Sequence, residues 1–200
     1  MAGVDGPGLR RLGTQAGPIA WLYPGRLRRQ RMTQTDDLLG NNARYAGDFR
    51  KGDLAAPPAR RVAVLACMDA RLDPARILGL EEGDAHVIRN AGGVVTDDAV
   101  RSLAVSQHLL GTKEVMLIHH TRCGMLGLSD EEFAARLERE AGERPPWRAR
   151  GFADLEQSVR DSIGRLERSP FLPHRDRIRG FVYDVESGML REVPDQRSRP

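Results

Sequence analysis

The feature that most constrains the fold is a short apolar run at residues 62–66 that ends directly in polar, reactive side chains. Such a run, rich in β-branched residues, is typical of a central strand buried on both faces of a parallel sheet. Asp73 follows as a helix N-cap, with Pro74 in the first turn. The stretch therefore predicts a strand, a turn and a helix, and turns of this kind carry the ligand sites of open α/β sheets.

Three reactive side chains stand at alternate positions after this run: Cys67, Asp69 and Arg71. If the backbone stays extended there, the two-residue period of a strand points all three the same way. A thiol, a carboxylate and a guanidinium would then share one pocket.

The rest of the chain repeats strand and helix in turn, which predicts an α/β fold with a mainly parallel central sheet flanked by helices. The last two strands enclose a turn at residues 186–188 and predict a C-terminal antiparallel edge hairpin. We expect strands at residues 62–66, 85–89, 114–119, 178–184 and 190–193, and helices at 33–45, 73–80, 96–110, 129–140 and 153–168.

The net charge of +3 comes from the N-terminal segment. Residues 1–31 hold six arginines and one acid, which leaves 25 basic and 27 acidic residues in 32–200. We expect residues 1–31 to be a disordered basic extension or translated upstream sequence, with a nucleic-acid or membrane tether as the alternative. Residues 32–200 then form one α/β domain, which we expect to bind no nucleic acid.

The chain has two cysteines, Cys67 and Cys123, and lacks an apolar segment of the roughly 20 residues that a membrane span needs. We therefore expect a soluble, cytoplasmic protein without a membrane partner. In that setting a sparse cysteine pair indicates metal binding or catalysis more than a disulfide framework, although one disulfide stays possible on count alone.

His120 stands three residues before Cys123, at the end of the third predicted strand. If that strand neighbours the one bearing Cys67, the two cysteines and the histidine meet at one sheet edge. They would supply three ligands to a tetrahedral zinc and leave the fourth position open, as in catalytic sites. His119 is assigned a structural role, but a one-residue shift in register would exchange it with His120.

Each of these residues also has an ordinary structural interpretation. Cys67 is also explained as a small buried hydrophobe, and His120 as a core or capping residue. Asp69 and Arg71 could form a surface ion pair of little energetic value. The two cysteines, however, both fall just past predicted parallel strands, one beside a histidine and the other beside an acid and a base, and this joint placement favours a site.

At these residues the sequence resembles the β-class carbonic anhydrases, from about Met32 to the C-terminus, and most closely the small actinobacterial-type members. Arg122 departs from the pattern, since relatives often carry Asp or Asn there, and it adds positive charge that could tune anion binding. The motifs that carry the resemblance are Cys67-Met68-Asp69-Ala70-Arg71, Arg89-Asn90-Ala91-Gly92-Gly93 and His120-Thr121-Arg122-Cys123-Gly124.

The resemblance implies one Zn²⁺ per chain, bound by Cys67, His120 and Cys123, and a homodimer or dimer-based tetramer. The implied activity is reversible hydration of CO2 to bicarbonate and a proton by zinc-bound hydroxide. Two thiolates make zinc a weaker Lewis acid than three neutral histidines do, so a helper is needed. We expect Asp69 to orient the hydroxide while Arg71 holds the carboxylate, and a closed state in which Asp69 itself ligates zinc at lower pH.

Two other classes of function stay open. The same fold and ligands would serve a hydrolase of carbonyl sulfide or carbon disulfide. The chain could also be a non-catalytic zinc protein or a thiol-based enzyme with Cys67 as the nucleophile near Arg71. Stoichiometric zinc that shields both thiols from alkylation would discriminate against the thiol enzyme.

Overall fold

The computed structural model describes residues 33–194, so the prediction for residues 1–31 lies outside the described residues. The described chain divides into two compact units, with the division between Gly52 and Asp53. Within this part of the chain, no helix is both long and apolar enough to cross a membrane.

The first unit contains helix α1 (Gln34–Asp48), which is longer than the helix expected at 33–45. Thr33 begins it with a capping box: its hydroxyl accepts a hydrogen bond from the N–H of Asp36, whose carboxylate accepts one from the N–H of Thr33. These bonds satisfy orphan N–H groups of the first turn and stabilise the helix despite Gly40. None of the side chains of α1 is buried.

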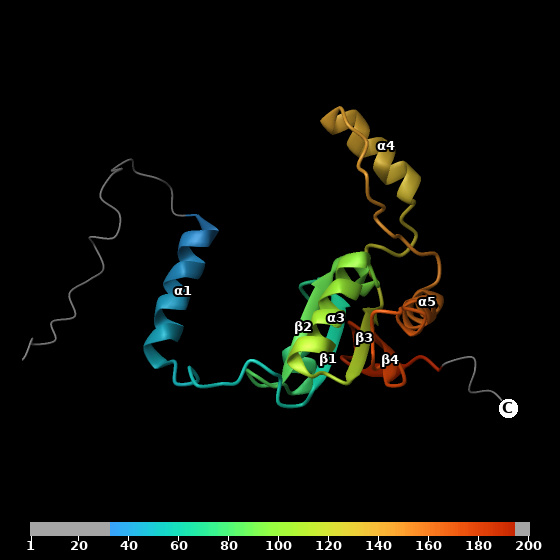
Figure 1. Ribbon diagram of the computed structural model, residues 1–200. Helices are drawn as coiled ribbons and strands as arrows, with labels where there is room; N and C mark the ends of the chain where they lie inside the picture. The colour runs from blue at the N-terminus through green and yellow to red at the C-terminus, as the bar shows by residue number, and fades with distance from the viewer. Residues whose placement is uncertain (1–32, 195–200) are drawn as a thin grey trace, which may run out of the picture. The chain divides into compact units, whose positions relative to one another are not determined.

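The second unit is built on a five-stranded sheet in the order β2-β1-β3-β4-β5 (Figure 1). Strands β1 to β4 pair in parallel, and β5 pairs antiparallel with β4, which confirms the predicted mainly parallel sheet and its edge hairpin. The strands are β1 (Val62–Cys67), β2 (Ala85–Asn90), β3 (Glu114–His120), β4 (Ile178–Tyr183) and β5 (Leu190–Glu192).

Helices cover both faces of this sheet and follow the predicted order. Leu103 of α3 and Val159 of α5 pack with Leu65 and Leu117 in one buried cluster, so α3 and α5 share a face. The other face is covered by α2 and by loops around residues 125 and 152. The helices are α2 (Pro74–Leu78), α3 (Asp97–Leu110), α4 (Asp130–Ala141), α5 (Leu155–Glu167) and the 3-10 turn η1 (Ala91–Gly93).

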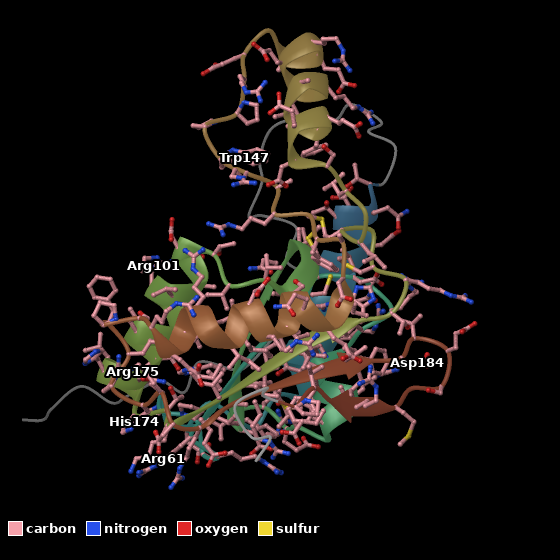
Figure 2. All side chains as sticks on the ribbon, turned by 90° about the vertical axis from the view of Figure 1, so that its right-hand side faces the viewer. Arg61, Arg101, Trp147, His174, Arg175 and Asp184 are labelled. Atoms are coloured by element: carbon pink, nitrogen blue, oxygen red, sulfur yellow. The ribbon has the colours of Figure 1, made fainter. Side chains whose placement is uncertain are left out.

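Side-chain caps explain where these elements begin and turn. Asp73 and Thr96 accept hydrogen bonds from the first-turn N–H groups of α2 and α3, as N-caps do. Asp184, labelled in Figure 2, follows β4, and its carboxylate accepts hydrogen bonds from the N–H groups of Glu186 and Ser187. That turn reverses the chain into β5 and so closes the edge hairpin.

Candidate metal centre

The two cysteines and His120 meet at one edge of the sheet. Cys67 is the last residue of β1 and His120 the last residue of β3, and these strands are parallel neighbours. Cys123 follows in a turn where the N–H of Leu126 donates to the carbonyl of Cys123 at 3.1 Å. All three side chains are buried, and their ligand atoms lie within 4.8 Å of one another.

This donor set fits a tetrahedral zinc ion. The Sγ atoms of Cys67 and Cys123 lie 3.9 Å apart and form no disulfide. Two thiolates on zinc at about 2.3 Å, at the tetrahedral angle, are about 3.8 Å apart. Nδ1 of His120 donates to the carbonyl of Thr121 at 2.9 Å, which leaves Nε2 as the unprotonated nitrogen. That buried Nε2 has no hydrogen-bond partner among the described residues, as expected of an atom that ligates a metal.

The two thiols share a hydrogen bond that separates their acidities. The bond from the Cys123 thiol lowers the pKa of Cys67 to about 4, against a smaller opposing effect of burial. The same bond and burial raise the pKa of Cys123 above its usual range. Because the thiolate is the form that binds a metal, both cysteines would be deprotonated in the metal-bound site.

Glycine in η1 allows the backbone to pass directly beside the ligands. Gly93 has φ +67°, and a Cβ there would lie 2.8 Å from the backbone nitrogen of Cys67 and 2.8 Å from the carbonyl oxygen of Ile118. η1 thus packs between the ends of β1 and β3. In the sequence, the Gly92-Gly93 pair that closes the Arg89–Gly93 motif is the signal for this close approach, because glycine adopts a positive φ and has no Cβ to clash.

His119 lies on the other side of β3 from the ligand cluster and has a different environment. Its Nε2 donates to the carbonyl of Gly93 at 3.1 Å, and its ring lies 5.8 Å from that of Phe152. Burial lowers the pKa of His119 to about 4, so the ring is neutral at pH 7. The cluster that could hold a metal contains His120 and not His119.

Asp69 and Arg71 form a two-pronged ion pair next to the cluster. Nε and Nη2 of Arg71 donate to Oδ1 and Oδ2 of Asp69 at 2.9 and 2.8 Å, and the Arg71 backbone N–H also donates to Oδ1. These bonds hold the pKa of the Asp69 carboxyl well below its usual range. Oδ2 of Asp69 lies 3.7 Å from Nε2 of His120, so the ionised carboxylate borders the cluster.

The backbone beyond Cys67 is a turn and does not stay extended. The N–H of Leu72 donates to the carbonyl of Asp69 at 3.0 Å, and residues 70 and 71 form the turn. Asp69 and Arg71 therefore meet because the chain folds back, and the two-residue period of a strand does not apply to them. The carbonyl of Arg122 accepts a further hydrogen bond from Arg71 at 3.1 Å and joins the two ligand loops.

The side chain of Arg122 pairs with an acidic residue outside the cluster. It adopts a positive φ of 55°, and its exposed guanidinium forms an ion pair with Glu186 at 2.6 Å. Its backbone carbonyl is the atom that Arg71 contacts.

Comparison with known proteins gives three consistent matches. The carbonic anhydrase family model matches residues 62–190. Beta-carbonic anhydrase 1 of Mycobacterium tuberculosis is 54% identical over 162 residues, which cover 81% of this chain and 99% of that protein. A carbonic anhydrase structure from Streptococcus mutans has a TM-score of 0.77 at 41% identity, covering 82% of this chain and all of that one.

A second group of relatives carries a different name. A carbon disulfide hydrolase of Acidianus is 34% identical over 165 residues, which cover 70% of this chain and 80% of that protein. The sequence and the structure agree on the common family of all these proteins. This chain belongs to the β-class carbonic anhydrases, a family of enzymes.

Proposed function

We propose that this protein catalyses the reversible hydration of CO2 to bicarbonate and a proton, with one Zn²⁺ per chain held by Cys67, His120 and Cys123. The observation that carries the proposal is the buried cluster of two sulfurs and one imidazole nitrogen beside the adjacent ends of β1 and β3. That nitrogen has no hydrogen-bond partner among residues 33–194. The 54% identity to a protein named beta-carbonic anhydrase 1 supports CO2 as the substrate.

A bound zinc supplies a Lewis acid that lowers the pKa of a water molecule in its fourth position. The residues of the chain would then orient that water, and the proton it loses would pass to buffer. The Asp69 carboxylate, ionised and 3.7 Å from Nε2 of His120, is placed to accept a hydrogen bond from that water. Arg71 fixes both oxygens of the carboxylate, so the carboxylate would hold the water in one orientation. In that orientation one lone pair of the water would face CO2.

Asp69 has a second possible partner in the same site. If Arg71 releases the carboxylate, rotation of Asp69 toward the cluster would bring it to the fourth metal position and exclude water. The bidentate pair with Arg71 opposes this closed arrangement. We propose that the ion pair between Asp69 and Arg71 keeps the site open. We expect the population of the closed form to increase as the pH falls.

The decisive experiment is stopped-flow CO2 hydration by protein of measured zinc content. We expect Asp69→Asn to retain zinc but to lose about 10²- to 10³-fold in kcat, the usual cost of removing one positioned hydrogen-bond partner of the reacting atoms. Asp73→Asn is the matched control: it changes an acid in the same turn, and asparagine keeps the N-cap of α2.

Cys67→Ser, which we expect to lose zinc, is the blank. An unchanged rate in Asp69→Asn would remove the helper role of Asp69. Zinc-loaded wild type without turnover above the blank would refute CO2 hydration as the function.

Hydrolysis of carbon disulfide or carbonyl sulfide is the second candidate, favoured by the relatives named carbon disulfide hydrolase. If CO2 is the substrate, the zinc-loaded protein incubated with either sulfur compound should release no hydrogen sulfide above the Cys67→Ser blank. Alkylation of both thiols with zinc bound would instead indicate a thiol-based enzyme, because ligation blocks the sulfurs.

We further propose a cytoplasmic homodimer, or a tetramer built from such dimers. Helix α1 exposes Leu38, Leu39 and Tyr45 and has no buried side chain. A short helix with exposed apolar residues is stabilised when a partner covers them. Light scattering should give at least twice the monomer mass of 22.2 kDa; a monomer would refute the proposal.

A further inference from the structure

Arg89 is an exposed residue on β2 whose guanidinium reaches across to the turn that follows β1. Its Nε and Nη2 donate to the carbonyl of Cys67 at 3.1 and 2.9 Å. Nη2 also donates to the carbonyls of Asp69 and Leu72, each at 2.7 Å. One side chain thus contacts three carbonyls of a single turn.

These three carbonyls lie where the chain leaves the sheet. Cys67 is opposite Asn90, and the last backbone bond between the strands runs from the N–H of Met68 to the carbonyl of Asn90 at 2.9 Å. Beyond it the turn leaves the sheet, and within the turn the carbonyl of Asp69 also accepts the N–H of Leu72 at 3.0 Å. The guanidinium of Arg89 adds charge-assisted hydrogen bonds to all three carbonyls from one rigid, planar group.

We infer that Arg89 is a positioning residue that holds the metal-binding turn in its working geometry. The inference rests on the proposed zinc site, because the carbonyls that Arg89 binds belong to a proposed ligand, Cys67, and to the proposed helper, Asp69. The third belongs to Leu72, a fully buried residue that anchors the end of the turn. Releasing Arg89 would free the Cys67 sulfur and the Asp69 carboxylate to move together.

Arg71 does not duplicate this role. It donates to the carboxylate of Asp69 and to the carbonyl of Arg122, and no hydrogen bond from its side chain to a carbonyl of residues 67–72 is found in the described structure. Arg71 therefore orients the Asp69 side chain, while Arg89 fixes the backbone that carries it. A lysine at position 89 would offer one ammonium in place of the planar fork and would reach fewer of the three carbonyls.

The test is the rate at which zinc-loaded protein transfers its metal to a chromophoric chelator. We expect Arg89→Ala to release zinc about 10- to 100-fold faster than wild type, the usual cost of losing a residue that supports a ligand. Arg89→Lys should fall between them. Arg179→Ala is the matched control, because it removes the bidentate pair between Arg179 of β4 and Glu192 of β5. This pair lies away from the turn, so the release rate should stay unchanged.

Millimolar methylguanidinium should slow zinc release from Arg89→Ala toward the wild-type rate, because the vacated position is open to solvent. A merely structural loss would not respond to the added cation. Unchanged release in Arg89→Ala, or equal acceleration in Arg179→Ala, would overturn the inference. If Arg89→Ala does not fold, as judged by circular dichroism, an unchanged rate in Arg89→Lys would do so.

A second readout needs neither zinc nor CO2. In zinc-free protein, the Cys67 and Cys123 thiols should react faster with iodoacetamide in Arg89→Ala than in Arg179→Ala, because a loosened turn exposes them. Equal rates would refute the positioning role even if wild type proved to bind no zinc. Wild type that binds zinc but does not hydrate CO2 would refute the proposed activity. The zinc-release assay would still test the positioning role of Arg89.

Discussion

Replacing Gly93 by alanine tests whether the close packing of η1 holds the ligand strands in place. Gly93 has φ +67°, and an added Cβ would lie 2.8 Å from backbone atoms of both β1 and β3. These neighbours belong to hydrogen-bonded strands, so they cannot rotate away as a side chain would. Gly111 offers a matched control, because it has φ +71° at the end of α3 and an added Cβ there meets nothing within 4 Å.

Both substitutions place alanine in the left-handed backbone region, but only Gly93→Ala also creates a steric clash. Alanine in the left-handed region costs about 1–2 kcal/mol at either position. Overpacking adds about 1–3 kcal/mol at Gly93 only. We therefore expect Gly111→Ala to lower the free energy of unfolding by about 1–2 kcal/mol and Gly93→Ala by about 2–5 kcal/mol. Only Gly93→Ala should weaken zinc binding, since relief of the clash moves Cys67 relative to His120.

Urea unfolding of the zinc-free proteins measures the first effect without the stabilisation that a bound metal adds. Competition with a chelator of known affinity measures the second. Equal losses of stability in Gly93→Ala and Gly111→Ala, with equal zinc affinity, would refute the argument that η1 packs rigidly between the strands.

Two further predictions concern the core. Leu103→Ala should lower the free energy of unfolding by about 2–5 kcal/mol because the side chain is fully buried, whereas Leu109→Ala, 75% exposed, should change it by less than about 0.5 kcal/mol in the same urea titration. Burial lowers the pKa of His119 to about 4. As the pH falls, His119 is therefore protonated in the unfolded chain before it is protonated in the folded one. This difference lowers the free energy of unfolding by about 2 kcal/mol between pH 7 and pH 5. Zinc-free His119→Gln should lose correspondingly less stability over this range than wild type; equal losses would contradict the assignment.

The parallel sheet and the helix order could be predicted from the sequence because each buried strand is a short apolar run and each helix has its own cap. The predictions were least accurate at the ends of the helices and in the turn after Cys67. Helix α1 continues past the expected end at residue 45, and α2 ends at Leu78, before the expected residue 80. The backbone after Cys67 turns because of its bond from Leu72 to Asp69, which alternate spacing does not reveal.

The contacts of Arg89 could not be predicted from the sequence. The sequence marks Arg89 only as the start of a motif, and its partners lie 17 to 22 residues earlier in the chain. The parallel register that places Ala66 opposite Arg89 brings them together. Register depends on which strands pair and how far each is shifted, and local composition specifies neither.

The sequence by itself determined the chemistry that this protein has available: two cysteines and a histidine at the ends of buried strands, and an acid and a base beside them. Tertiary structure alone decided that these groups converge, because only the pairing of β1 with β3 brings Cys67 and Cys123, 56 residues apart, to 3.9 Å. It also decided that His120, and not His119, joins them. Adjacent residues of a strand face opposite sides of the sheet, and the register of β3 assigns each histidine its side.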